Sequence, residues 1–158
     1  SDMAADAIGL MDALNIDRAH IVGASIGGTI AQIIASDYPQ RTQSLVSIVS
    51  TTGASHLPRA QGDAQGGLLQ VSDTVGEMQA QLEESGMFSS AIPRQVMAIV
   101  TVGDRSDKVS QISLPTVLLH GAQNNLMPKE HGQHTHALLE GSKFIVVEGM
   151  RHNPLLLI

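Results

Sequence analysis

The spacing of apolar positions predicts a helix at the start of the chain and a strand directly after it. Between residues 2 and 14 apolar side chains recur every three or four residues, as in an amphipathic helix, and Asn15 ends the pattern. Residues 19–22 form a short apolar run that stops at Gly23, and helical spacing resumes over residues 26–35. This part of the chain therefore reads as helix, strand, sharp turn and helix.

Three further apolar runs predict the rest of a sheet. They cover residues 45–49, 116–119 and 144–147, they contain β-branched residues, and each is followed shortly by glycine. Residues 130–139 can form a helix between the last two runs. Because strands and helices alternate, the expected class is α/β, with a mostly parallel sheet of about four strands and crossover helices.

The segment between the second and third runs differs in kind from the rest of the chain. Residues 51–90 are rich in Gly and Gln and poor in large apolar side chains, which indicates a variable, cap-like excursion over the surface. We expect a weak helix at 75–84 and a returning helix at 93–102. With 158 residues, 42% of them hydrophobic, the chain suits one domain that covers residues 1–158.

Composition narrows the range of partners. The formal net charge of -6 and the lack of any Lys/Arg cluster disfavour nucleic acid. No apolar run approaches the roughly 20 residues of a membrane span, and the first residues lack the features of a signal peptide, so no membrane partner and a cytoplasmic, soluble protein are expected. Cysteine is absent, so neither a disulfide nor a thiolate metal site can form.

The most informative motif lies where the first strand meets the second helix. The letters GASIGG at residues 23–28 match the Gly-x-Ser-x-Gly pattern of a nucleophile elbow, in which Ser25 is displayed on a strained turn. The glycines two residues either side of Ser25 are expected to avoid collisions that a Cβ would cause. The Ile26 N–H, at the start of the helix, could stabilise an oxyanion. The alternative is a glycine-rich turn without chemistry.

A phosphate-binding turn is disfavoured, because the Lys of a P-loop and the third glycine of a dinucleotide turn are missing. No cofactor is therefore expected. The elbow (DRAHIVGASIGG, residues 17–28) resembles that of α/β-fold hydrolases related to esterases, methylesterases and cofactor-free haloperoxidases. The later segments LPTVLLHG (114–121) and VEGMRH (147–152) resemble the strands leading to the catalytic acid and the catalytic histidine, and they follow in the family's order.

The resemblance implies a serine hydrolase that acts on a small-molecule carboxylic ester, with Ser25 as nucleophile and His152 as base. His20, His56 and His120 are interpreted as structural, because they lie in predicted strands or in the excursion. A further group, His131, His134 and His136, leaves a metal site open, but a solvated helix face is favoured and no metal is expected.

The chain departs from the family at the position of the acid. The residue three after Gly121 is Asn124, and a neutral amide cannot hold the histidine and stabilise its charged form as a carboxylate does. Asp104 and Asp107 are alternative acids, although they precede the acid strand. No segment resembles the loop that supplies the second oxyanion amide. The alternative function is therefore a non-catalytic fragment or interaction domain derived from a hydrolase.

The resemblance also implies that the chain corresponds to the C-terminal part of such a domain, since it opens at the helix before the elbow. The strand at 19–22 would then lack its earlier neighbour in the sheet. It is apolar and has no Lys or Pro to protect an edge. We expect this open edge to pair with a second copy, giving a homodimer, to cause aggregation, or to pair with a missing N-terminal segment.

Overall fold

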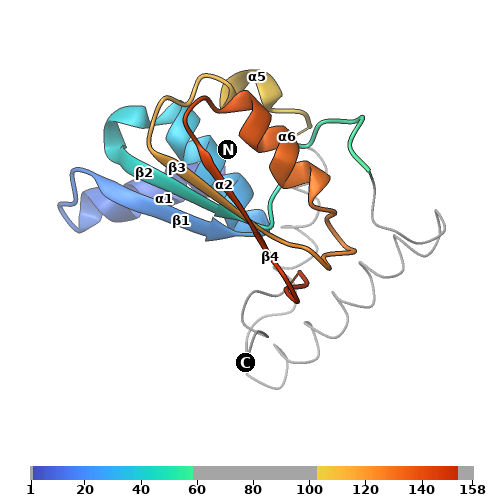
Figure 1. The fold of residues 1–158 in the computed structure, drawn as a ribbon. Coiled ribbons are helices and arrows are strands. Elements are labelled where there is room, and N and C mark those ends of the chain that lie inside the picture. Colours follow the sequence, from blue (N-terminus) through green and yellow to red (C-terminus); the bar gives the residue numbers. More distant parts are fainter. Residues whose placement is uncertain (1, 59–102, 153–158) are drawn as a thin grey trace.

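The fold is a four-stranded parallel sheet with helices packed against it (Figure 1), as seen in a computed structural model that describes residues 2–58 and 103–152. The strand order is β1-β2-β3-β4, and all three neighbouring pairs are parallel. The elements are α1 (Asp2–Ala13), β1 (Ala19–Ala24), α2 (Ile26–Asp37), η1 (Pro39–Arg41), β2 (Thr42–Ile48), α5 (Ser106–Val109), β3 (Thr116–Gly121), α6 (Glu130–Leu138) and β4 (Lys143–Val147). The predicted α/β class, with a parallel sheet of about four strands, is confirmed.

The excursion and its helices fall largely outside the described residues. Both predicted helices, at 75–84 and 93–102, lie there, and only residues 51–58 of the excursion are described. Two short elements were not predicted, α5 and the 3-10 turn η1, because four and three residues are too few to show helical periodicity. No helix within the described residues is long and apolar enough to cross a membrane.

The strand β2 begins three residues earlier than its apolar run. Thr42 pairs with Ala19 and is fully buried, and its hydroxyl donates a hydrogen bond to the Tyr38 carbonyl at 3.2 Å. Ser47, also buried, accepts a hydrogen bond from the Gln32 side chain of α2 at 3.1 Å. Polar side chains that are satisfied in this way can occupy buried strand positions, which hydropathy alone does not show.

The first helix ends as its sequence indicates. Asn15 has a φ of 55°, in the left-handed region where asparagine is tolerated better than most residues. The Ile16 N–H then donates to the Met11 carbonyl at 2.8 Å, so one of the last helical carbonyls finds a partner. This turn leads the chain directly into β1.

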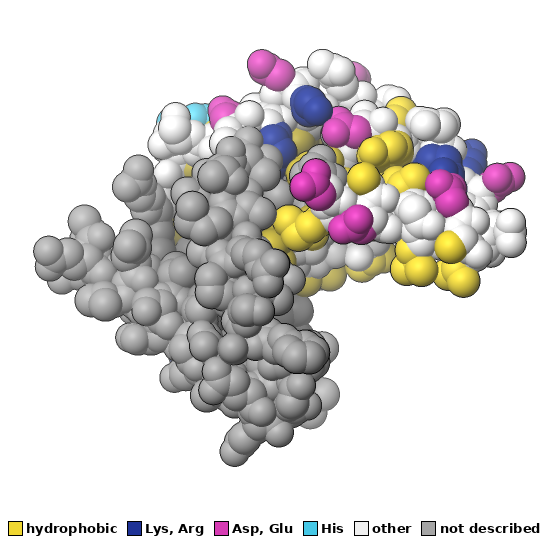
Figure 2. All heavy atoms as spheres, turned by 180° about the vertical axis from the view of Figure 1, so that it is seen from behind, with side chains coloured by type: hydrophobic (Ala, Val, Ile, Leu, Met, Phe, Trp, Pro, Cys, Tyr) yellow, Lys and Arg dark blue, Asp and Glu magenta, His cyan; other side chains and the backbone are white. Residues whose placement is uncertain are grey.

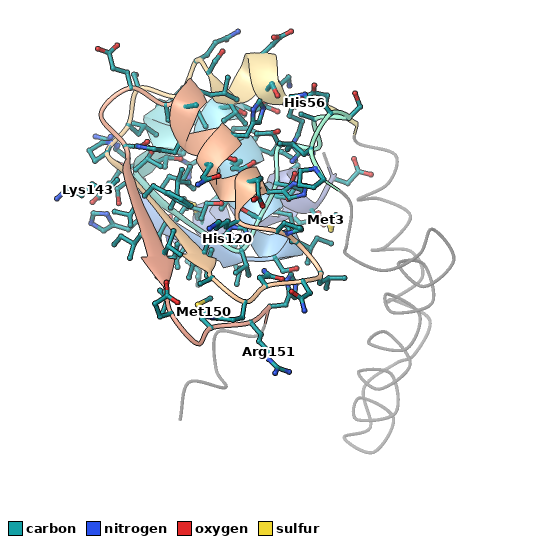
Figure 3. The ribbon with its side chains drawn as sticks, turned by 45° about the vertical axis from the view of Figure 1, so that its right-hand side comes forward. Met3, His56, His120, Lys143, Met150 and Arg151 are labelled. Atoms are coloured by element: carbon teal, nitrogen blue, oxygen red, sulfur yellow. The ribbon has the colours of Figure 1, made fainter. Side chains whose placement is uncertain are left out.

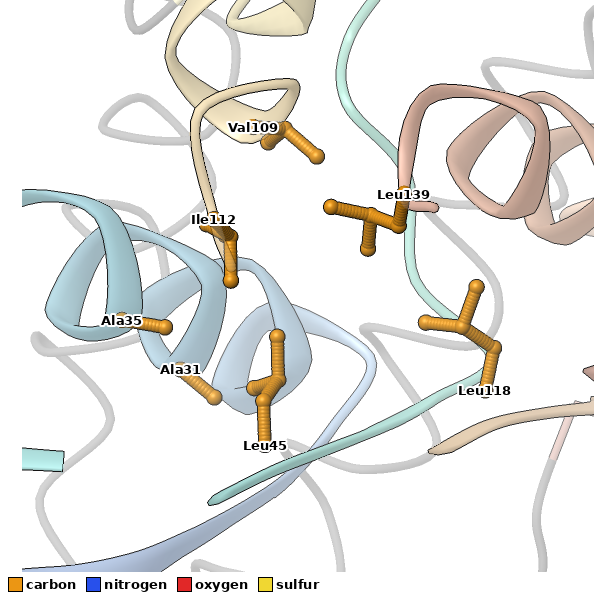
Figure 4. Packing of buried hydrophobic residues seen from close by; sticks show 7 residues of the cluster. All are labelled: Ala31, Ala35, Leu45, Val109, Ile112, Leu118 and Leu139. Atoms are coloured by element: carbon orange, nitrogen blue, oxygen red, sulfur yellow. The ribbon is translucent and has the colours of Figure 1, made fainter. Parts of the chain in front are cut away.

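The core is aliphatic and lies between the sheet and the helices (Figure 4). One cluster joins α2, β2, α5, β3 and the segments after α5 and α6. It consists of Ala31, Ala35, Leu45, Val109, Ile112, Leu118 and Leu139. A second cluster joins α1 to α2 and includes Ile8, Met11 and Ile33. Ile21 of β1 packs against both clusters, so α1 and α2 cover the same face of the sheet.

The opposite face of the sheet carries exposed apolar side chains among the described residues. Val22 is 63% exposed, and it pairs with Val46, which pairs with Val117, so the three side chains share one face. Ile145 of β4 is 45% exposed. Yellow side chains are visible along the lower rim of the space-filling view (Figure 2). Within the described sheet β1 has β2 as its single neighbour, and pairing of its free edge with a second copy or an earlier segment stays a prediction.

Candidate functional site

The site centres on Ser25, which connects β1 to α2 in a strained backbone conformation. Its φ of 53° and ψ of -119° are rarely adopted by a residue with a side chain. The Ser25 N–H donates to the Ile48 carbonyl at 2.8 Å, which ties the turn to the end of β2. This geometry is that of a nucleophile elbow, with the hydroxyl at the carboxyl end of the sheet.

The glycines around the elbow differ in whether the structure has room for a side chain at their positions. A Cβ on Gly23 would lie 2.1 Å from the Gly27 carbonyl oxygen, and a Cβ on Gly28 would lie 2.7 Å from Ser50 Cβ. A Cβ on Gly27, by contrast, would meet nothing within 4 Å. The expectation that both glycines flanking Ser25 avoid a collision is therefore wrong for Gly27, because the space that its Cβ would occupy is open.

Three residues predicted from three separate segments meet at this turn. The Ser25 hydroxyl lies 2.9 Å from His152 Nε2, and His152 Nδ1 lies 3.2 Å from the amide nitrogen of Asn124. Ile26 is the first residue of α2, where backbone N–H groups have no acceptor within the helix. The arrangement thus places a hydroxyl, an imidazole, an amide and a helix N-terminus around one point.

The loops after β3 and β4 are docked against each other, which fixes Asn124 relative to His152. The Gln123 N–H donates to the Met150 carbonyl at 3.1 Å, and the Ala122 N–H donates to the Val147 carbonyl at 3.0 Å. Gly121 permits this approach, since a Cβ there would lie 2.2 Å from the Met150 oxygen. Met150 and Arg151 can be followed on the loop after β4 in Figure 3.

The Asn124 side chain is buried and hydrogen-bonded on both sides. It is 4% exposed, and its carbonyl oxygen accepts the Met127 backbone N–H at 3.0 Å while its amide nitrogen faces His152. The Met127 carbonyl in turn lies 2.7 Å from Nε2 of His120, a residue of β3 that is 1% exposed (Figure 3). Sequence reasoning missed Met127, because its contribution is a backbone peptide.

Burial shapes the protonation of the imidazoles at the site. The pKa of His152 is lowered from its ordinary value, chiefly because burial disfavours the charged ring and secondarily because of His120. Burial likewise lowers the pKa of His120, against the opposing effect of its hydrogen bond to Met127. Both rings are therefore neutral at neutral pH, and a neutral His152 has one ring nitrogen with a free lone pair.

The alternative acids are directed elsewhere. Asp104 accepts hydrogen bonds from the N–H and the hydroxyl of Ser106 at 2.8 and 2.6 Å, and these bonds lower the pKa of its carboxyl. In the described part of the chain neither Asp104 nor Asp107 is hydrogen-bonded to His152, whose Nδ1 faces Asn124. The amide at the acid position is thus not replaced by either carboxylate.

The histidines of α6 hold neighbouring loops. His131 lies 2.8 Å from both the Thr51 hydroxyl and the Pro58 carbonyl, and His134 Nε2 lies 3.0 Å from the Ser106 hydroxyl. The expectation of a solvated helix face therefore holds only in part, because the His131 and His134 side chains are partly buried. Among residues 2–58 and 103–152, no group of three His, Asp or Glu side chains could hold a metal ion.

The remaining histidines bond to nearby groups or stack on them. His20 and His136 lie 2.7 Å from the hydroxyls of Ser44 and Ser142, respectively. The ring of His56 packs edge-on against His134 with 4.9 Å between the ring centroids. In the described part none of the three is hydrogen-bonded to Ser25.

Comparison with known proteins confirms the predicted partial α/β-hydrolase fold. A family model described as alpha/beta hydrolase fold matches residues 1–84. A pimeloyl-(acyl-carrier protein) methyl ester esterase from Neisseria meningitidis is 26% identical over 98% of this chain and 69% of its own length. A solved N-acyl homoserine lactone degrading enzyme is 26% identical, with a TM-score of 0.75 over 96% of this chain and 67% of that chain.

A third relative shows the fold alone. A hydrolase of the alpha/beta fold family from Bacillus anthracis has a TM-score of 0.78 at 15% identity and covers 97% of this chain and 67% of its own. The chain spans about two thirds of the length of these relatives.

Proposed function

The chain belongs to the alpha/beta hydrolase fold family, and from that premise we propose that it hydrolyses a carboxylic ester with Ser25 as nucleophile. The observation that carries the proposal is the 2.9 Å contact between the Ser25 hydroxyl and His152 Nε2 at a strained strand-to-helix turn. His152 is the general base, and the Ile26 N–H is one donor to the oxyanion.

The reaction runs in two halves. The Ser25 oxygen attacks the ester carbonyl carbon while its proton passes to His152 Nε2, and the carbonyl oxygen becomes an oxyanion near the Ile26 N–H. The tetrahedral intermediate collapses, the bond to the leaving alkoxide breaks, and His152 returns the proton to that alkoxide. Water then attacks the acyl-serine in the same manner, which releases the carboxylic acid and restores Ser25.

The amide side chain of Asn124 slows both halves of this reaction. A carboxylate would accept a hydrogen bond from His152 Nδ1–H and stabilise the imidazolium as it forms, whereas the amide nitrogen 3.2 Å away can only donate. In a serine protease, the same exchange of acid for amide lowers turnover by about 10⁴. We therefore propose a slow hydrolase for small esters. Its relatives include a methyl ester esterase and a lactone-degrading enzyme, which favours this substrate class.

Asn124 also favours a second candidate function, an interaction domain that has retained the fold without turnover. The two candidates differ in whether Ser25 reacts with an electrophile. The sheet, the elbow and the docked loops are needed by both, so their geometry does not separate them.

A fluorophosphonate probe is expected to label Ser25, because no other described serine occupies a strained strand-to-helix turn. Labelling should be lost in Ser25→Ala. The matched control is Ser36→Ala at the far end of α2, whose hydroxyl bonds to the Ile33 carbonyl, and which should label like the parent. Undiminished labelling of a folded Ser25→Ala variant would remove the nucleophile assignment, and silence of both the parent and Asn124→Asp would favour the interaction domain.

The labelling rate, whatever its absolute value, should keep its plateau as the pH falls to the ordinary pKa of a histidine. Burial lowers the pKa of His152, so the neutral ring persists as the pH falls, and the rate should decline only below about 6.5. The measurement is the rate of fluorophosphonate labelling from about pH 8 down to about pH 4. An inflection above the ordinary imidazole value would show that a nearby carboxylate, rather than burial, governs His152.

A further inference from the structure

A series of hydrogen bonds connects buried His120 to Ser25 through the two backbone groups of a single residue, Met127. His120 Nε2 lies 2.7 Å from the Met127 carbonyl, and the Met127 N–H lies 3.0 Å from the Asn124 side-chain oxygen. The Asn124 amide nitrogen lies 3.2 Å from His152 Nδ1, and His152 Nε2 lies 2.9 Å from the Ser25 hydroxyl. His120 and Asn124 are 1% and 4% exposed, so these two side chains are shielded from water.

The direction of each bond follows from groups that can act in only one way. A carbonyl oxygen only accepts, so His120 carries its proton on Nε2 and donates it to Met127. A backbone N–H only donates, so the Asn124 atom that faces Met127 is its oxygen and the atom that faces His152 is its NH₂. His152 Nδ1 must then accept, and the single proton of the neutral ring resides on Nε2.

We propose that the backbone of Met127, anchored at its carbonyl by His120, is a positioning element whose N–H orients the Asn124 amide and so fixes His152 in the Nε2–H tautomer. The inference rests on the function proposed above and identifies the tautomer of His152 as the factor that limits the rate of hydrolysis. With a proton on Nε2, His152 donates to the Ser25 oxygen and has no lone pair to receive the serine proton. Ser25, His152 and Asn124 are in contact, yet the imidazole is in the wrong state to act as a base.

Any rearrangement that removes the proton from His152 Nε2 leaves two hydrogen-bond donors facing each other in a buried site. If the His152 proton moves to Nδ1, it meets the Asn124 NH₂. If the Asn124 amide rotates, its NH₂ meets the Met127 N–H instead. An unsatisfied buried donor should reduce the population of the productive tautomer by about 10-fold to 100-fold. An aspartate at position 124 would accept from both neighbours at once.

The tautomer can be read directly by nitrogen NMR of the whole chain labelled with ¹⁵N-histidine, at a pH of about 8 where imidazoles are neutral. His152 is assigned as the signal that disappears in His152→Gln. The expected pattern is Nε2–H in the parent and Nδ1–H in Asn124→Asp. Nδ1–H in the parent, or Nε2–H persisting in folded Asn124→Asp, would overturn the proposal.

The anchoring role of His120 has its own variants. His120→Leu removes the donor to the Met127 carbonyl, and the His152 signal should shift to a mixture of both tautomers. His120→Gln retains an N–H donor and should restore the parent pattern, while His20→Leu, on the open face of the sheet, is the control that should change nothing at His152. A parent-like tautomer in folded His120→Leu would overturn the role of His120.

These readouts do not require turnover. If the tautomers behave as proposed but Ser25 remains unlabelled by fluorophosphonate in Asn124→Asp, the hydrolase function fails and the positioning role of Met127 stands.

Discussion

Replacing Asn124 with aspartate is expected to raise the rate of hydrolysis of a short p-nitrophenyl ester by at least about 100-fold. The carboxylate would accept both the Met127 N–H and a proton-bearing His152 Nδ1, with no change in the positions of the neighbours. His152 Nε2 would then carry a lone pair directed at the Ser25 hydroxyl, 2.9 Å away. The measurement is kcat/KM for release of p-nitrophenolate by the parent and the variant.

The matched control is Asn125→Asp, which adds the same charge at the next residue, where the side chain is exposed. It should alter kcat/KM little, because a solvated charge is screened from the imidazole. A change below about threefold in folded Asn124→Asp would contradict the account of the defect, and would indicate that the oxyanion site rather than the acid position limits the rate.

The second large effect concerns the elbow's backbone. Gly23→Ala is expected to destabilise the protein by about 3 kcal/mol, because its Cβ would lie 2.1 Å from a backbone oxygen of α2 that cannot move without distorting the turn. Gly27→Ala is the control within the same motif. Its Cβ meets nothing within 4 Å, and alanine favours the helix, so it should be neutral or stabilising by up to about 1 kcal/mol.

Chemical denaturation of both variants measures the difference as a change in the free energy of unfolding. Equal destabilisation by the two substitutions would mean that conformational preference at the motif, rather than the close approach of β1 and α2, makes glycine necessary there.

The sheet and its main helices could be predicted from the chain because apolar runs mark buried parallel strands directly. Each of the four predicted runs overlaps one of the strands β1 to β4, and the long helices differ from prediction by no more than two residues at their ends. The boundaries failed where polar groups are buried. Thr42 can occupy the buried first position of β2 because its hydroxyl donates a hydrogen bond to the Tyr38 carbonyl. The residue type alone does not indicate that such an acceptor is nearby.

The residues of the candidate site could be predicted because each lies at a fixed offset from a strand end. Ser25, Asn124 and His152 belong to three segments, and parallel strands bring their carboxyl ends to one edge of the sheet. The role of the Met127 backbone could not be predicted, because every residue carries a backbone carbonyl and nearly every residue an N–H. Only the fold determines where these groups point. The contacts of His131 with Thr51 and Pro58 are hidden for the same reason.

The central claim is that Ser25, with His152 as its base, forms the acyl intermediate. The most direct measurement is mass spectrometry of peptides from protein quenched in acid after brief incubation with p-nitrophenyl acetate, for the parent and for Asn124→Asp. The account predicts an acetyl group on the peptide that contains Ser25, formed slowly in the parent and much faster in the variant. Acetylation at another residue, or no acetyl group on Ser25 in either folded protein, would contradict it.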